Sequence, residues 1–305
     1  MSIYLPIAQM SVDIFMLLAL GGGAGILSGL FGIGGGFLIT PLLIFGGVPP
    51  AIAVSSVATQ MIASSISGFS SHWRNNNVDF RMGCLLLIGG FIGSSLGVYL
   101  FSYLQKLGQI DIVISIGYVI LLSIIGGMMA FESVNAILRK KIVASDEPTI
   151  NIQQSKLPWI VYFPHSNLHI SIIIPLLTSI FIGIFVSMLG VGGGFFMIPA
   201  MIYIFKMPAK IVVGTSLFQM IFISANVTFL QAITTQTVDI FLAGLLLIGS
   251  SIGAQLGIRL TTKLPTEYLR SILALIVLGI ALQLALKLTL TPTDLYEMLL
   301  IRNNL

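Results

Sequence analysis

The feature that most constrains this chain is the length of its stretches without charged side chains. No Asp, Glu, Lys or Arg occurs between Asp13 and Arg74, or between Lys156 and Lys206. A helix needs about 20 apolar residues to cross the hydrocarbon of a bilayer, so each stretch has room for two or more crossings. Charged residues make up 8% of the 305 residues and the mean hydropathy is +1.06, whereas about a quarter of a soluble domain is charged. The chain is therefore predicted to be an all-α polytopic membrane protein, and a soluble fold is excluded.

The remaining bulk properties set fewer limits. The net charge of +4 rests on only 14 basic residues, which in membrane proteins flank the cytoplasmic ends of the spans, so we expect no nucleic-acid partner. Cys84, the single cysteine, lies in an apolar run and is interpreted as a small buried core residue. The N-terminus lacks the basic region of a secretory signal, and residues 14–31 are long enough to span, so they are predicted to form the first helix.

Hydropathy divides the chain into apolar segments and one hydrophilic break. Eight long segments are expected to cross the membrane: 14–31, 51–71, 82–104, 110–131, 170–189, 209–231, 239–260 and 269–288. Two short ones, 37–47 and 195–205, follow glycine clusters, and as straight helices they would reach only about 16 Å. We expect a first transmembrane repeat at 1–138, a polar, cytoplasmic loop at 139–168, a second repeat at 169–290 and a tail at 291–305.

The two halves repeat in sequence. Gly32-Ile33-Gly34-Gly35-Gly36-Phe37 matches Gly190-Val191-Gly192-Gly193-Gly194-Phe195 at an offset of 158 residues. Gln60-Met61 matches Gln219-Met220, and Val78-Asp79 matches Val238-Asp239. Duplicated halves with the substrate held between them are typical of secondary transporters.

The basic residues favour inverted over parallel repeats. If only the long segments cross, the repeats are parallel and the 14 basic residues divide eight to six between the two faces. If the short segments also cross, each repeat has five passes and eleven basic residues share one face: Arg74, Arg81, Arg139, Lys140, Lys141, Lys156, Lys206, Lys210, Arg259, Lys263 and Arg270. Because cytoplasmic loops are enriched in Lys and Arg, we favour an inverted arrangement with both termini outside. Whether segments 37–47 and 195–205 fully cross is left open.

The triple-glycine clusters are the first candidate site. Adjacent glycines end a helix, and the freed backbone groups then need protein or a hydrated cavity as partners. A helix that restarts after such a turn presents bare N–H groups, which bind anions without a charged side chain. We therefore assign substrate contacts to Gly35, Gly36, Gly193 and Gly194. Spaced glycines such as Gly89, Gly93 and Gly97, and their counterparts Gly249, Gly253 and Gly257, are interpreted instead as close helix contacts.

A second candidate set lies on polar helix faces. Its hydroxyls and amides are expected to complete the shell of the bound anion, and they belong to Ser56, Gln60, Thr215, Ser216 and Gln219, in corresponding parts of the two repeats. Hydroxyls can bond to their own backbone, but an amide within the bilayer needs a partner, so we expect Gln60 and Gln219 to line the pathway near a pseudo-twofold axis.

Ionisable residues, Asp79 and Asp239 among them, fall near the ends of the predicted segments, where carboxylates mark helix starts or the membrane interface. This placement argues against an intramembrane proton relay or cation site. His72 and Arg74 directly follow the first polar helix and are assigned to the pathway mouth, with interfacial anchoring as the alternative. His165 and His169 stand in a predicted loop without companions at metal spacing. We therefore predict no metal, no cofactor and no catalytic residues, and no enzyme activity.

The chain resembles the sulfite exporter TauE/SafE family over roughly residues 25–100 and 183–260. The resemblance rests on the two glycine-cluster motifs, on Gly214-Thr215-Ser216-Leu217 and on the Val-Asp pairs at 78–79 and 238–239. The resemblance implies an inner-membrane permease that moves small anions, typically sulfite or organosulfonates such as sulfoacetate. The first copy departs from the motif with Ser55-Ser56-Val57-Ala58.

The sequence therefore predicts a multi-pass transporter of the cell inner (plasma) membrane that moves a small anion by alternating access between two repeats. Its expected partners are the anion and the lipid bilayer, and a homo-oligomer is left open. The alternatives are a transporter or channel for another small solute or a metal, and a non-transporting membrane subunit.

Overall fold

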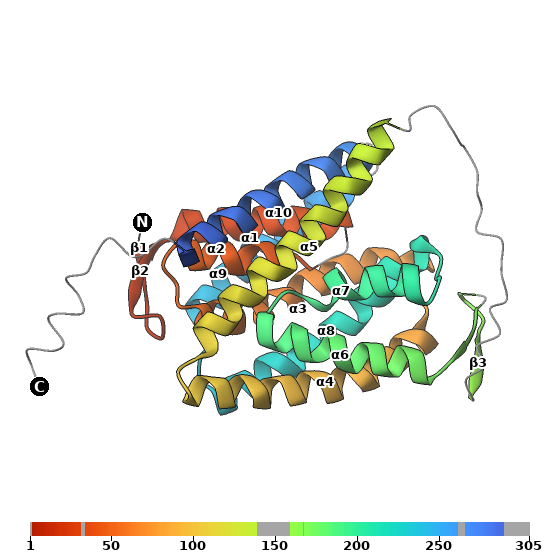
Figure 1. The fold of residues 1–305 in the computed structure, drawn as a ribbon, viewed down its shortest axis with the longest axis horizontal. Helices are drawn as coiled ribbons and strands as arrows, with labels where there is room; N and C mark the ends of the chain where they lie inside the picture. Colours follow the sequence, from red (N-terminus) through yellow and green to blue (C-terminus); the bar gives the residue numbers. More distant parts are fainter. Residues whose placement is uncertain (1, 32–33, 139–158, 167, 262–265, 290–305) are drawn as a thin grey trace, which may run out of the picture.

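The computed structural model describes residues 2–31, 34–138, 159–166, 168–261 and 266–289. Its first half opens with an antiparallel hairpin of two four-residue strands and continues as five helices (Figure 1). These elements are β1 (Ser2–Leu5), β2 (Met10–Asp13), α1 (Ile14–Phe31), α2 (Gly36–Phe45), α3 (Pro50–Arg74), α4 (Phe80–Lys106) and α5 (Ile110–Leu138).

The second half has the same order of elements. A hairpin again precedes a helix, a short helix follows a glycine cluster, and three longer helices complete the half. These elements are β3 (Ile160–Phe163), β4 (Leu168–Ser171), α6 (Ile173–Leu189), α7 (Gly193–Pro199), α8 (Ala209–Thr234), α9 (Ile240–Thr261) and α10 (Thr266–Thr289), with a π-helical turn η1 (Ala200–Ile204) continuing α7.

Within the described ranges, five helical segments are long and apolar enough to cross a membrane: Pro50–Arg74, Phe80–Lys106, Ile110–Met128, Ile211–Thr234 and Ile240–Gly257. Shorter apolar helices include Ile14–Leu30, Gly36–Phe45 and Gly193–Ile204. The predicted all-α polytopic membrane fold is confirmed, and each apolar segment found in the sequence corresponds to a helix.

The two hairpins and the exposure of one side chain differ from the sequence analysis. Neither hairpin was predicted, because four-residue strands give too short an alternating pattern to distinguish from a loop. The segment predicted as a loop at 139–168 holds β3, and His169, also expected in a loop, lies in β4 and stacks on Tyr162 with ring centroids 4.6 Å apart. Residues 139–158 and 290–305 lie outside the described residues. Cys84 is exposed on α4, so its interpretation as a buried core residue is wrong: an apolar run includes the face of the helix that looks outward.

Each strongly packed helix pair takes one helix from each half. α1 packs on α9, α6 on α4, α3 on α8, and α5 on α10. The spaced glycines make these approaches close: a Cβ on Gly93 would overlap the backbone carbonyl of Ile180 in α6, and one on Gly253 would overlap that of Gly22 in α1. The interpretation of these glycines as helix contacts is confirmed.

The two hairpins lie at opposite ends of the molecule (Figure 1). An inverted repeat predicts this placement, because equivalent elements then start from opposite faces of the membrane. The inverted-repeat architecture, the domain boundaries and the side on which the termini lie stay predictions.

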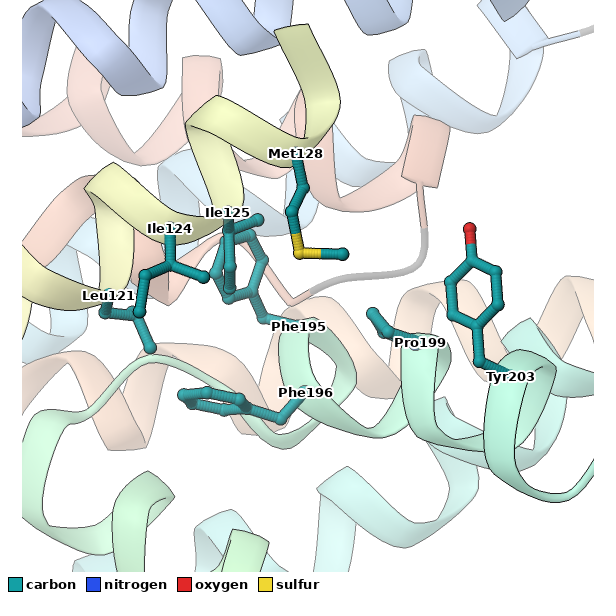
Figure 2. A pocket seen from close by; sticks show the side chains of 8 residues that line it. All are labelled: Leu121, Ile124, Ile125, Met128, Phe195, Phe196, Pro199 and Tyr203. Carbon is teal, nitrogen blue, oxygen red and sulfur yellow. The ribbon is translucent and has the colours of Figure 1, made fainter. Parts of the chain in front are cut away.

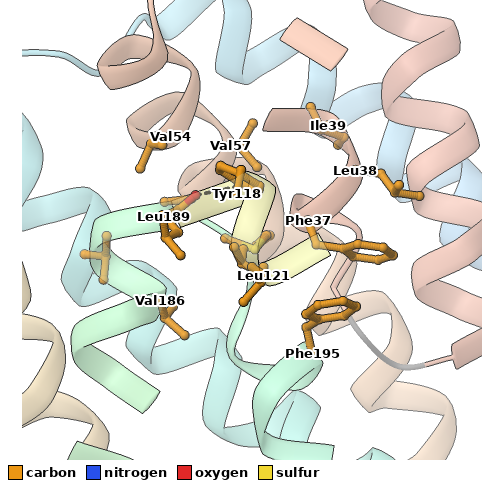
Figure 3. Packing of buried hydrophobic residues seen from close by; sticks show 14 of the residues in the cluster. Phe37, Leu38, Ile39, Val54, Val57, Tyr118, Leu121, Val186, Leu189 and Phe195 are labelled. Carbon is orange, nitrogen blue, oxygen red and sulfur yellow. Dashed lines mark hydrogen bonds between the residues drawn. The ribbon is translucent and has the colours of Figure 1, made fainter. Parts of the chain in front are cut away.

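The short helices meet at the centre of the buried core. Phe37 of α2 and Phe195 of α7 stack with ring centroids 4.4 Å apart and an interplanar angle of 15° (Figure 3). Both rings are almost fully buried. The buried Tyr118 of α5 donates its hydroxyl hydrogen bond to the Leu189 carbonyl at the end of α6, 2.5 Å away. The sequence-predicted glycine clusters therefore lead directly into the core.

Candidate functional site

Two glycine turns interrupt the backbone beside this core. α1 ends at Phe31 and α2 begins at Gly36, and between them Gly34 and Gly35 have φ values of 90° and 71°. The second turn, between α6 and α7, holds Gly190 at 62° and Gly192 at 88°. Residues with a Cβ rarely adopt this left-handed conformation. The prediction that the clusters end one helix and start another is confirmed.

Two methionine side chains fill the space against these turns. A Cβ on Gly34 would overlap the terminal methyl group of Met220, and a Cβ on Gly36 would lie 2.6 Å from the Met61 sulfur. The backbone N–H of Gly194 donates to the Met220 sulfur at 3.1 Å. A thioether is a weak acceptor, so this N–H has a partner that an oxyanion would replace with a stronger bond.

Neither Met61 nor Met220 was among the site residues predicted from the sequence. They occupy matching positions directly after Gln60 and Gln219, and that repeat was visible in the sequence. Methionine is also the ordinary filler of irregular apolar space. Only the structure shows that the Met61 and Met220 side chains lie against the backbone of the glycine turns.

Gln60 of α3 and Gln219 of α8 are both buried. Thr59 of α3 lies 3.3 Å from Thr228 of α8, hydroxyl to hydroxyl, whereas the other end of α3 meets Leu217 at Gly68. These contacts make the helices antiparallel and set the two glutamine backbones about 10 Å apart along them, at 1.5 Å per residue. The expectation that the glutamine side chains face each other near the pseudo-twofold axis stays a prediction.

The two amides nevertheless have unsatisfied atoms. Neither the oxygen nor the nitrogen of the Gln60 amide has a hydrogen-bond partner, and the Gln219 oxygen has none. The Gln219 nitrogen lies 3.5 Å from where a Cβ on Gly90 would stand, so this side chain points toward α4. A buried polar atom without a partner costs about 1–3 kcal/mol, and such atoms commonly mark the place of a ligand or water.

The hydroxyls of the predicted site residues Ser56, Thr215 and Ser216 form hydrogen bonds with backbone groups. Thr215 accepts a hydrogen bond from the Asp79 N–H at 2.9 Å and donates to the Ile211 carbonyl at 2.8 Å. Ser56 accepts one from the Asp239 N–H at 3.0 Å. Ser216 donates to the Val213 carbonyl at 2.9 Å, within its own helix. The structure thus places the Ser56 and Thr215 hydroxyls at the starts of α9 and α4.

The same two helix starts anchor the hairpins. The Asp239 carboxylate accepts hydrogen bonds from the backbone N–H groups of Phe241 and Leu242 and from that of Ile7 in the first hairpin, at 3.0–3.2 Å. The Asp79 carboxylate accepts from the Met82 N–H and from the Ser166 hydroxyl in the second hairpin. Both carboxylates are buried. The prediction that these acidic residues mark helix starts is confirmed.

His72 and Arg74 lie in the last turn of α3, away from the methionines. Arg74 is exposed and His72 is partly buried, with no hydrogen-bond partner for its Nδ1 atom. His72 packs beside Gly214, one residue before Thr215. The proposed pathway mouth therefore adjoins the start of α4. In the described part of the chain no three His, Cys, Asp or Glu side chains come together as a metal site would need.

An apolar groove with a volume of about 350 Å³ opens between α5 and α7 (Figure 2). Its walls are α5 on one side and α7 with the π-helical turn η1 on the other. The lining side chains are Leu121, Ile124, Ile125, Met128, Phe195, Phe196, Pro199 and Tyr203. Phe195 thus belongs both to this groove and to the central aromatic stack.

Comparison with known proteins identifies the family to which this chain belongs. Residues 17–284 match the sulfite exporter TauE/SafE family. The chain belongs to that family. It is 29% identical over 244 residues to the probable membrane transporter protein YjnA of Bacillus subtilis, which covers 79% of this chain and 86% of the relative. Another Bacillus subtilis protein, the probable membrane transporter protein YunE, is 28% identical over 218 residues, or 69% of this chain and 74% of the relative.

A plant member shares a shorter region. Sulfite exporter TauE/SafE family protein 5 of Arabidopsis thaliana is 48% identical over 42 residues, which cover 14% of this chain and 9% of that protein. No solved structure matches the chain. The family and the relatives are membrane transporters, so this member of the TauE/SafE family is a multi-pass membrane transporter and not an enzyme.

Proposed function

We propose that the protein transports a small anion, sulfite or an organosulfonate, across the cell inner (plasma) membrane by alternating access between its two halves. The observation that carries this proposal is the Gly194 N–H, which is buried in the core and donates to the Met220 sulfur. Backbone N–H groups suit oxyanions. Both glycine turns lie in stretches of sequence without charged residues, which keeps the binding weak enough for release.

In this mechanism the anion displaces Met220, and at the other turn Met61, from the glycine backbone. Methionine has three rotatable bonds and no strong polar contact to lose, so it moves aside at low cost. The oxygens of the anion then accept hydrogen bonds from the amides of Gly35, Gly36, Gly193 and Gly194. The unpartnered amide atoms of Gln60 and Gln219 are proposed to act next along the pathway.

The stacked pair of Phe37 and Phe195 is proposed to close the central barrier in this conformation. Ser56 and Thr215 are proposed to hold the starts of α9 and α4, which flank the site, because their hydroxyls accept hydrogen bonds from the Asp239 and Asp79 N–H groups. The Ser216 hydroxyl bonds within α8. His72 and Arg74 are proposed to attract the anion at one mouth of the pathway.

Anion flux in proteoliposomes tests the function. Purified protein is reconstituted with sulfite, sulfoacetate, sulfate or thiosulfate inside, and an imposed membrane potential drives exit. We expect saturable flux of one sulfur oxyanion that is lost in Gly194→Val. Absence of flux for every anion at both polarities would refute the proposal and favour another solute.

Site-directed labelling tests the displaced methionine independently of the substrate. Gly193 has room for a Cβ, whose nearest contact would be the Met220 side chain at 3.4 Å, so Gly193→Cys reports on this space in a Cys84→Ser background. A negatively charged thiol reagent should react faster when Met220→Ala is added. Met16→Ala, a change on the exposed face of α1, is the control. Equal rates in all three proteins would show that Met220 does not cover the turn.

A further inference from the structure

The groove between α5 and α7 continues a surface that faces lipid. Ile112, Ile116, Ile120, Ile124 and Met128 recur every four residues along α5, and all are 45–58% exposed. They lie in a segment long and apolar enough to cross the membrane, so hydrocarbon is their solvent. The last two members of this row, Ile124 and Met128, also line the groove.

The shape of the groove comes from an irregular helix. Pro199 has no backbone N–H and ends α7, and the next five residues form the π-helical turn η1. Such turns widen the backbone locally and frequently occur at functional sites. In the other half, α10 packs on α2, whereas here a space of about 350 Å³ separates α5 from α7, within the range of ligand pockets.

The chemistry of the lining favours an acyl chain. All side chains in the groove are apolar except for Tyr203, which is 60% exposed on η1. Tyrosines are enriched where hydrocarbon meets lipid headgroups, because the ring is apolar and the hydroxyl polar. In Figure 2 Phe195 and Met128 lie between Tyr203 and the far wall at Leu121.

We propose that one acyl chain of a bilayer lipid occupies this groove, with its headgroup on the Tyr203 side and its chain against Phe195. The chain fills a space that the protein leaves open and keeps α5 apart from α7. Because Phe195 also stacks on Phe37, the bound chain supports the central barrier from the membrane side. This binding site stands independently of which solute is transported.

Quenching by brominated lipid tests the site. Trp73 and Trp159 are replaced by Phe, and a single reporter is introduced as Phe196→Trp in the groove or as Ile92→Trp on the exposed face of α4. In nanodiscs with phosphatidylcholine brominated on the acyl chain, the fluorescence of the groove reporter should fall in proportion to the fraction of brominated lipid, as for a single bound chain, whereas the exposed control, which several chains contact, should be half-quenched at a lower fraction. A groove reporter that stays unquenched in fully brominated lipid would overturn the proposal.

Native mass spectrometry supplies a second measurement on the unlabelled protein. The purified chain should retain one phospholipid, and Leu121→Trp, which fills the groove, should lose it, whereas Ile92→Trp should keep it. Retention in Leu121→Trp would place the lipid elsewhere and overturn the proposal. A dimer without lipid that dissociates in Leu121→Trp would identify a second copy of the chain as the occupant instead and would also overturn it.

Discussion

Substituting alanine at Gly35 and at Gly193 should have opposite consequences, although the two glycines occupy equivalent positions in the sequence repeat. Gly35 has a φ of 71°, and a Cβ there would lie 2.7 Å from the backbone oxygen of Ala24. The left-handed conformation costs an alanine about 1–2 kcal/mol, and shifting the packed α1 backbone costs about 1–3 kcal/mol more. Gly35→Ala should therefore lose about 2–5 kcal/mol of folding free energy.

Gly193 avoids both costs. Its φ is not positive, and its Cβ would meet Met220 at 3.4 Å, an ordinary contact. A smaller loss of entropy on folding favours alanine there by about 0.4–1 kcal/mol. At about 2–4 °C per kcal/mol for a chain of this size class, Gly35→Ala should lower the unfolding temperature in detergent by about 4–20 °C, whereas Gly193→Ala should raise it by about 1–4 °C.

Thermal unfolding followed by loss of the monodisperse peak in size-exclusion chromatography measures this difference. The wild-type protein and Gly127→Ala, an open position on α5, serve as references. Similar shifts for Gly35→Ala and Gly193→Ala, in either direction, would refute the argument that backbone conformation distinguishes the two turns.

Three further substitutions test other parts of the structure. Asp239→Ala leaves three backbone amides without their acceptor and should destabilise the protein by about 2–4 kcal/mol, whereas Asp13→Ala, at an exposed site, should change the unfolding temperature much less. Gln60→Leu removes two unpartnered polar atoms and should raise the unfolding temperature while lowering anion flux; a lower temperature would show that the amide has a partner. Gly93→Leu should abolish a monodisperse product because α6 leaves no space there, and normal folding of this variant would contradict the observed α4–α6 packing.

Much of the fold was predictable because it follows from local composition. Charge-free stretches and apolar segments located the helices, since hydrocarbon excludes charged side chains wherever they occur in the chain. The glycine clusters predicted both turns because the conformation of glycine is a property of the residue itself. Asp79 and Asp239 were recognisable as helix starts for the same reason. The hairpins were not predicted, because each strand has only four residues and its alternating pattern is too short to recognise.

The candidate site was predictable only in part. The sequence by itself determined a helical membrane protein, two broken segments and a family whose members are transporters, because these depend on hydropathy and on residue motifs. Only the tertiary structure decided that Thr215 and Ser56 bond to the starts of α4 and α9, and that Met61 and Met220 cover the glycine turns. The polarity of a side chain says that it needs a partner, but the packing of α3 and α8 against the other helices decides which partner is within reach.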